Sequence, residues 1–129
     1  MMSLQFTQIH HVAIIVSNLD KAKHFYVDIL GLPIIREHWR PDKNDTKLDL
    51  QLGNCELEIF AVKNPPQRLS FPEAAGLRHL AFKTEDIEAK VAYLKANGVK
   101  CEEIRYDTFT NEKMTFFFDP DGLPLELHE

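Results

Sequence analysis

The sequence predicts an α+β fold made of two tandem βαβββ modules, and two observations predict it. His79 lies 68 residues after His11, and Glu126 lies 68 residues after Glu58. The sequence around these residues repeats at the same spacing, since His-Val-Ala-Ile matches His-Leu-Ala-Phe and Leu-Glu-Ile matches Leu-Glu-Leu. In both halves a β-rich run precedes a helical pattern and three further strand-like runs. Duplication of one supersecondary unit accounts for both observations.

The first module spans residues 8–62. It opens with a β-rich run at residues 9–16, after which apolar residues recur at helical spacing until Gly31 stops the helix. Three strand-like runs separated by turn-forming residues then follow, at residues 34–38, 47–52 and 56–62. This order is βαβββ.

The second module spans residues 77–128 and repeats that order. Its expected elements are a strand at 77–83, a helix at 85–97, and strands at 100–106, 113–118 and 123–128. Asp119-Pro120-Asp121-Gly122 predicts a tight turn before the last strand. Residues 63–76 carry three prolines, cannot continue a sheet, and are expected to link the modules. We therefore predict one domain, residues 1–129, built from both modules.

Strand alternation predicts which side chains share a face. Val12, Ile14 and Val16 form an apolar set suited to packing under a helix, which leaves His11 on the other face. The same parity assigns that other face to a set of residues from both modules: Glu58, His79 and Glu126, with Asp49, Gln51, Thr115 and Phe117. A sheet covered by helices on one side can curl, so we expect helices outside and a cavity inside.

Two imidazoles and two carboxylates form a ligand set for a divalent metal ion, with Zn, Ni, Co, Mn and Fe all compatible. A glutamate that faces an enclosed cavity is costly unless it is paired or coordinated. His10 is out of phase with His11 and is expected on the helix side or at the strand end. Glu56 adjoins a turn and is expected to be solvated, while His128 shares the parity of Glu126.

The composition of the chain excludes several classes of binding partner. The net charge is −5 and the 15 basic residues are dispersed, which argues against nucleic acid. No signal-like segment or membrane-length apolar run occurs, so we expect a cytoplasmic protein with no membrane contact. Cys55 and Cys101 form no Cys-x-x-Cys motif and do not align under the repeat, and we expect two reduced thiols.

Four motifs in order resemble the vicinal oxygen chelate superfamily, which includes glyoxalase I, fosfomycin resistance enzymes, extradiol dioxygenases and bleomycin resistance proteins. They lie at residues 10–14, 25–32, 77–82 and 119–127, so the resemblance covers nearly the whole chain. It implies paired βαβββ modules around a divalent metal that chelates two oxygens of a small-molecule substrate. The ligands it implies are His11, Glu58, His79 and Glu126.

The glyoxalase I branch is the most similar, because it uses two histidines and two glutamates. It implies a lyase or isomerase that moves a proton between adjacent carbons through a metal-bound enediolate, on a substrate of hemithioacetal type. Glu126 is the expected catalytic base, with Glu58 the symmetric second candidate. No stretch matches a glutathione-recognition motif; the possible partners for an anionic substrate group are Arg36, Arg40, Lys47 and Arg105.

Two alternatives stay open at this point. One is a dioxygenase or thiol transferase with three ligands, in which Glu58 is not coordinated. The other is a metal-free module that binds a small molecule or drug without catalysis. The resemblance also implies a homodimer, in which His11 and Glu58 meet His79 and Glu126 of either the same chain or the partner.

Overall fold

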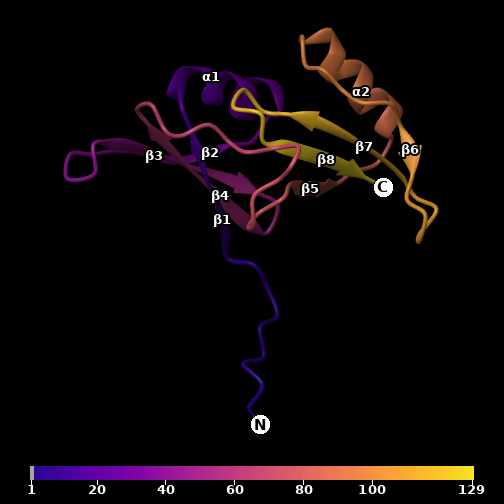
Figure 1. The fold of residues 1–129 in the computed structure, drawn as a ribbon, viewed down its shortest axis with the longest axis horizontal. Helices are drawn as coiled ribbons and strands as arrows, with labels where there is room; N and C mark the ends of the chain where they lie inside the picture. Colours follow the sequence, from indigo (N-terminus) through magenta and orange to yellow (C-terminus); the bar gives the residue numbers. More distant parts are fainter. Residues whose placement is uncertain (1) are drawn as a thin grey trace. The chain divides into compact units, whose positions relative to one another are not determined.

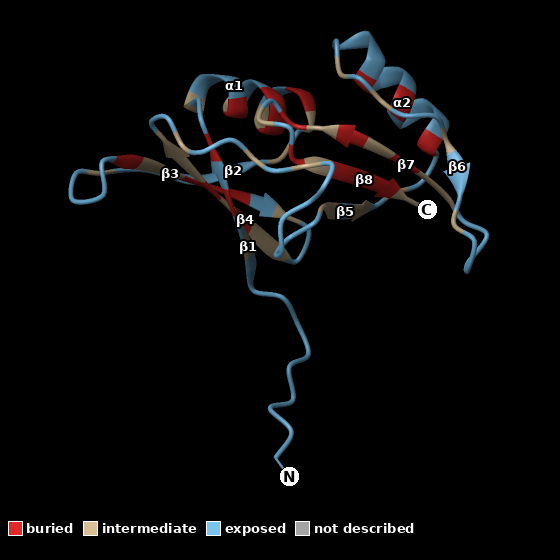
Figure 2. Ribbon diagram, in the orientation of Figure 1, coloured by how far each residue is buried: buried red, intermediate tan, exposed pale blue. Residues whose placement is uncertain are grey.

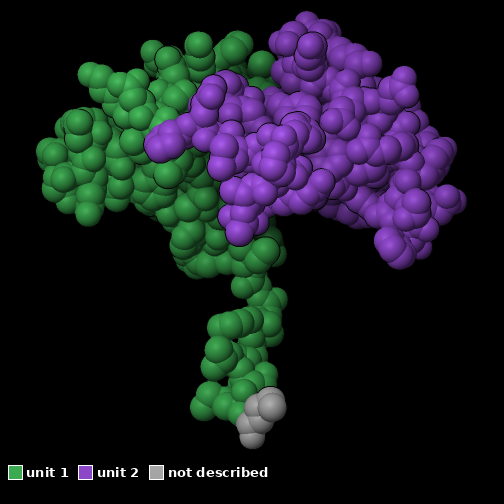
Figure 3. Space-filling view, viewed as in Figure 1, with its two compact units in different colours: residues 1–65 green, residues 66–129 purple. Residues whose placement is uncertain are grey.

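The computed structural model describes residues 2–129. The chain divides into two compact units, Met1–Pro65 and Pro66–Glu129 (Figure 3). The division falls inside the proline-containing stretch that the sequence predicts as a linker. Each unit holds one four-stranded sheet, and the α+β class with two tandem modules is confirmed (Figure 1).

Unit 1 has the predicted βαβββ order. Its elements are β1 (His11–Val16), α1 (Leu19–Lys23), η1 (His24–Ile29), β2 (Ile34–Arg40), β3 (Asp45–Leu52) and β4 (Cys55–Val62). The strands lie in the order β1-β4-β3-β2. β1 runs parallel to β4, and the other neighbouring pairs are antiparallel.

The helix of unit 1 has the predicted extent but not the predicted winding. Asn18 caps it, because its side-chain oxygen accepts a hydrogen bond from the Lys21 amide at 3.0 Å. After α1 the chain continues as the π-helix η1, in which the Leu30 amide donates to the Phe25 carbonyl at 2.9 Å. Two consecutive aromatic side chains of η1, Phe25 and Tyr26, are both buried. Apolar spacing alone cannot distinguish these two windings.

Unit 2 repeats the order with shorter elements. They are β5 (Leu80–Lys83), α2 (Ile87–Ala96), β6 (Arg105–Tyr106), β7 (Lys113–Phe118) and β8 (Pro124–His128). The strands lie in the order β5-β8-β7-β6, with β5 parallel to β8. The strand predicted at residues 100–106 is reduced to β6 and an isolated bridge between Cys101 and Phe117. α2 buries Ile87, Val91 and Leu94, which recur at helical spacing.

Burial follows the predicted alternation in β1 and in the centre of β4, whereas Leu125, Glu126 and Leu127 of β8 are all buried (Figure 2). In β1, Ile14 and Val16 are buried whereas His11, Ala13 and Ile15 are exposed. In β4, Leu57 and Ile59 are fully buried, and Glu58 between them is only partly so. One face of each sheet therefore supplies core, and the other face carries the candidate ligands.

The prediction for β7 is wrong by one residue. Asp49 pairs with Glu58, but it is Phe116 that pairs with Glu126. The turn before β8 is one residue longer than the turn at Gly53 and Asn54, so the 68-residue spacing becomes 67 in β7. A one-residue slip reverses the faces of a strand.

Thr115 and Phe117 therefore belong to the core face. Phe117 is 1% exposed, and its ring lies 6.4 Å from that of Phe82. The Thr115 hydroxyl donates to the Glu102 carbonyl at 2.8 Å.

Both cysteines are free thiols. Among residues 2–129, no helix combines the length and apolarity that a membrane crossing requires.

Candidate metal centre

Unit 1 brings His11 and Glu58 together. The parallel ladder sets Glu58 opposite Ala13 and sets His11 opposite Glu56, so His11 and Glu58 are diagonal neighbours on one face. Nδ1 of His11 lies 3.5 Å from Oε2 of Glu58. The Glu58 side chain is 15% exposed, which leaves its carboxylate accessible at the edge of the pair.

Unit 2 forms the equivalent pair from His79 and Glu126. The parallel ladder sets Glu126 opposite Ala81, as the 68-residue repeat predicts. Nε2 of His79 lies 3.1 Å from Oε1 of Glu126. Glu126 is 7% exposed although Leu125 and Leu127 occupy the opposite face, and among residues 2–129 His79 is its one ion-pair partner.

Two arginines and a phenylalanine support His79. Arg68 donates from Nη2 to the carbonyls of Leu77 and Arg78, at 3.2 and 2.7 Å, and so holds the backbone that leads into His79. Nη1 of Arg78 lies 3.1 Å from Nδ1 of His79, and the Phe116 ring meets the imidazole edge to face at 5.0 Å. The sequence does not indicate the role of Arg68, because it lies in the expected linker.

His10 lies just before β1, at the strand end as predicted, and is exposed. Its Nδ1 is 2.9 Å from Nδ1 of His11, and the two rings meet edge to face at 5.1 Å. Such a contact needs one ring to donate and the other to accept. His10 therefore orients His11 from outside the strand.

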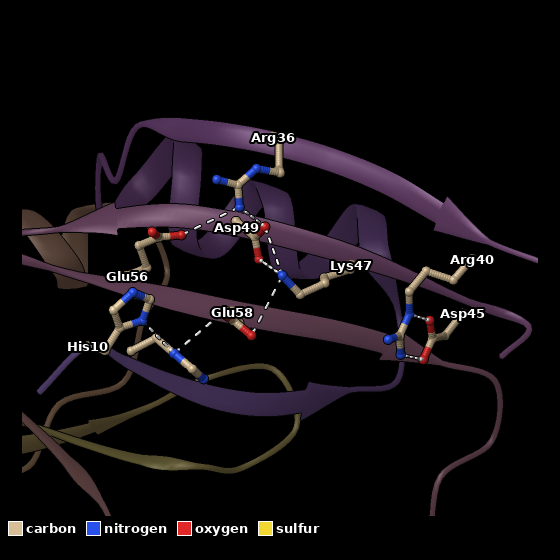
Figure 4. A network of polar contacts seen from close by, with 9 residues as sticks. His10, Arg36, Arg40, Asp45, Lys47, Asp49, Glu56 and Glu58 are labelled. Atoms are coloured by element: carbon tan, nitrogen blue, oxygen red, sulfur yellow. Dashed lines mark hydrogen bonds and ion pairs between the residues drawn. The ribbon is translucent and has the colours of Figure 1, made fainter.

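Charged side chains surround Glu58 on the adjoining strands (Figure 4). Asp49 of β3 is fully buried and accepts hydrogen bonds from Arg36 and Lys47, the latter at 2.9 Å. Lys47 lies 3.6 Å from Glu58, and Arg36 lies 3.6 Å from Glu56. The expectation that Glu56 is merely solvated is wrong, because it belongs to this ion-pair network.

The network lowers the pKa of the Asp49 carboxyl. Burial acts to raise that pKa, but hydrogen bonds from Lys47 and Arg36 together outweigh burial. Carboxylate oxygens of Asp49, Glu56 and Glu58 lie within 4.8 Å of one another, close enough to share a cation. The guanidinium of Arg36 and the ammonium of Lys47 already balance two of those charges. We therefore interpret the cluster as an ion-pair network that holds Glu58.

Arg40 has a different partner. It makes a two-pronged ion pair with Asp45, with both contacts at 2.7 Å (Figure 4). Its guanidinium lies 4.8 Å above the Phe60 ring. The hydrogen bond from Arg40 lowers the pKa of the Asp45 carboxyl. This pairing ties the ends of β2 and β3 together and makes Arg40 a structural residue.

The donor set fits a divalent metal ion. Each unit offers one imidazole nitrogen and one carboxylate oxygen directed at each other from neighbouring positions. A buried carboxylate such as Glu126 needs a cation, which either a protonated imidazole or a metal ion can supply. Mixed imidazole and carboxylate donors suit Zn, Ni, Co, Mn and Fe(II).

Comparison with known proteins identifies the family of this chain. The family model of the Glyoxalase/Bleomycin resistance protein/Dioxygenase superfamily matches residues 8–127. The chain belongs to this superfamily. The resemblance drawn from the four motifs is thereby confirmed.

Close relatives share the whole chain. The uncharacterized protein YaeR of Escherichia coli (strain K12) is 50% identical over 127 residues, covering 98% of each chain. The crystal structure of a glyoxalase family protein from Enterococcus faecalis is 60% identical, with a TM-score of 0.92 over 96% of this chain and 98% of the other.

More distant relatives have names that state an activity. The 2-epi-5-epi-valiolone epimerase of an Actinomyces species is 30% identical over 92% of this chain and 77% of its own. The metallothiol transferase FosB of Staphylococcus epidermidis is 34% identical over 93% of this chain and 81% of its own. The superfamily thus includes enzymes of different reaction types.

Proposed function

We propose that this protein is a divalent-metal-dependent lyase or isomerase of the glyoxalase I type. In this proposal it acts on a small oxygenated substrate and moves a proton between adjacent carbons. The supporting observation is the repeated pair, His11 with Glu58 and His79 with Glu126, at equivalent positions of two parallel ladders. The relationship to an epimerase favours proton transfer at carbon.

The four paired side chains would hold the metal ion. When bound, a divalent ion polarises substrate oxygens and so acidifies the neighbouring C–H bond. The Arg36, Lys47 and Asp49 network holds Glu58 in place, while Arg68 holds the backbone before His79. Both ligand pairs are therefore fixed by neighbours from their own unit, as a metal centre requires.

Glu126 is the stronger candidate for the catalytic base. The Glu126 side chain is 10% exposed and shares its sheet face with Phe116, whereas Glu58 has the Lys47 ammonium 3.6 Å away. A general base must be free to receive the proton that the substrate loses, and the Lys47 contact engages the Glu58 carboxylate. A carboxylate has two oxygens, so one residue can serve as ligand and as proton acceptor.

The proposal includes a homodimer in which residues 1–129 act as one functional domain. Two inactive double variants test how the site is assembled: His11→Ala with Glu58→Gln, and His79→Ala with Glu126→Gln. Co-expression restores about a quarter or more of the activity only if each site takes one pair from each chain. Light scattering on the mixture reports whether the two variants associate, so that a monomeric protein contradicts the homodimer directly.

The direct test combines metal analysis with isotope exchange. Purified protein should contain about one divalent ion per complete ligand set, and replacing His79 by Ala should remove it. With methylglyoxal and a series of thiols in D₂O, turnover should exchange the substrate proton next to the carbonyl. Full exchange activity in metal-free protein, or unchanged metal content in His79→Ala, would contradict the proposal.

The relationship to FosB favours a second candidate, a thiol transferase with three ligands. That enzyme would join a thiol to its substrate without exchanging a carbon-bound proton. It would also keep its metal and its activity in Glu58→Gln. Mass spectrometry of the products distinguishes the two candidates, since only thiol transfer yields a new thioether.

A further inference from the structure

A cavity of about 240 Å³ lies within unit 2, next to the His79 and Glu126 pair. Phe116 joins the two, because its ring lines the cavity and also contacts the His79 imidazole. Arg78, the residue before His79, lines the cavity as well. A molecule in this cavity therefore lies beside the candidate metal ligands of unit 2.

Two arginines line the cavity, and their guanidinium groups have N–H donors available for a ligand. Arg78 and Arg105 both line it, with side chains 65% and 51% exposed. Arg105 is paired with Glu102 at 3.0 Å, but Arg78 is 4.0 Å from Glu73, the outer limit of an ion pair. A guanidinium carries five N–H donors in a planar fork that matches a carboxylate.

The remaining wall is aromatic. The Arg105 guanidinium lies 5.4 Å over the Phe116 ring, so a charged donor and a flat apolar surface adjoin. Phe71 also lines the cavity and is 82% exposed, so it adds apolar surface that a ligand in the cavity would remove from water. The cavity thus offers cationic donors beside flat apolar surface.

We propose that this cavity binds a carboxylate-bearing substrate with a flat apolar or unsaturated body, and that Arg78 and Arg105 select its charge. The inference rests on the proposed function, because it names the substrate class of the same site. The two glutamates in the lining disfavour a dianion such as a phosphate ester, whereas one carboxylate can replace Glu73 or Glu102 on an arginine. The volume lies below the ~300 Å³ lower end for drug-sized ligands, which indicates a small metabolite.

The test uses probes that share one ring and differ in charge: benzoate, benzamide, benzylamine and phenyl phosphate. Each is titrated into the full-length protein, as purified and after chelator treatment, with calorimetry or protein NMR as readout. Benzoate should bind in both preparations and at least about tenfold more tightly than the other three. Arg78→Gln and Arg105→Gln should each weaken benzoate by about tenfold, and Arg105→Lys by less.

Lys100→Gln is the matched control, because it removes one positive charge from an exposed position of unit 2 outside the cavity lining. It should leave benzoate affinity unchanged. Circular dichroism confirms folding of each variant, and Arg105→Lys keeps the test valid if a glutamine variant unfolds.

Three outcomes would overturn the inference. They are equal affinity for benzoate and benzamide, tighter binding of phenyl phosphate, and benzoate binding that vanishes with chelator but persists in both arginine variants. The last outcome assigns the carboxylate to the metal. Loss of deuterium exchange or of metal, with arginine-dependent benzoate binding intact, would remove the proposed function alone.

Discussion

Units 1 and 2 each contain the same kind of parallel strand pair, but they differ in the strand that lies beside it. In both, a parallel strand pair presents one histidine and one glutamate on the same face. In unit 1 the next strand adds Lys47, Asp49 and Gln51 to that face, and in unit 2 the register places Met114, Phe116 and Phe118 there. Duplication has kept the ligand pair while the flanking strand changed from charged to apolar. The two glutamates therefore have the same backbone position and opposite surroundings.

The largest predicted effect separates those glutamates. Glu126→Gln should lower kcat by roughly 10²–10⁴, the usual contribution of a general base, because glutamine keeps the shape and loses the proton acceptor. Glu58→Gln should lower kcat by only about tenfold, since Lys47 already holds that carboxylate. Steady-state kinetics at saturating metal, with metal content measured in parallel, checks both. Equal losses would assign the two units equal roles.

Strand alternation and the repeat spacing were enough to predict that the histidine and the glutamate of each unit share a face, and both ladders keep the 68-residue spacing. The parallel pairing of the strands that carry them comes from the structure alone. The repeat spacing failed in β7, where one extra turn residue reverses the strand. That failure concealed Phe116, and with it the aromatic wall beside His79.

The roles of Arg68 and Arg78 could not be predicted from the sequence, for a different reason. Arg68 acts through hydrogen bonds that cross a proline-containing segment, and Arg78 contacts the residue next to it in the chain. Neither kind of contact leaves a periodic pattern in the sequence. Of the four cationic residues proposed as anion partners, Arg40 is bound to Asp45 and Arg36 and Lys47 to Asp49. Only the contacts of the folded chain distinguish them from Arg105.

The second prediction breaks the charged network of unit 1. Asp49→Asn should destabilise the protein by about 1–3 kcal/mol, because it leaves Arg36 and Lys47 without their buried carboxylate. Both cations keep partial contact with water, which limits the loss. Urea denaturation of wild type and variant at neutral pH measures it, and Gln51→Glu, an exposed change on the same strand face, is the control.

The pH dependence of that loss has a defined sign. The folded-state pKa of Asp49 is lowered below its ordinary 3.8, so its stabilisation is present above that value and declines as the pH falls through the folded-state pKa. The stability difference between wild type and Asp49→Asn should therefore shrink in strong acid. A difference that stays constant down to the acid limit would show that the charge of Asp49 contributes nothing.

The third prediction concerns how the candidate histidine of each unit is held in place. In unit 1, His10 contacts His11, and in unit 2, Arg68 holds the backbone before His79. Arg68→Met keeps the apolar stem and removes two hydrogen bonds to backbone carbonyls, so it should cost about 1–2 kcal/mol of stability. It should also weaken metal binding by roughly 10-fold or more, as loss of a supporting contact does at other sites. Unchanged metal affinity, measured by competition with a chelating dye, would limit Arg68 to a role in folding.

The smallest predicted effect concerns the ends of the last strands. By the 68-residue repeat His128 of β8 corresponds to Phe60 of β4, which lies under Arg40 in unit 1. In unit 2, Nε2 of His128 lies 3.1 Å from the Asp107 carboxylate. That hydrogen bond raises the pKa of His128 above 6.5 and lowers the pKa of Asp107 below 3.8. The histidine contribution is full below pH 6.5 and is lost as the pH rises through its raised folded-state value.

The Asp107 contribution has the opposite sign, since it is present above pH 3.8 and lost as the pH falls through the lowered folded-state pKa. His128→Gln should therefore reduce stability most between those two ordinary values and converge with wild type at alkaline pH. Asp45→Asn in unit 1 is the comparison, because its partner Arg40 stays charged and its loss should not change between pH 6 and 8. Thermal melts of both variants across that range check the contrast. A His128→Gln curve parallel to wild type from pH 5 to 9 would show that the pair is not ionised in the folded protein.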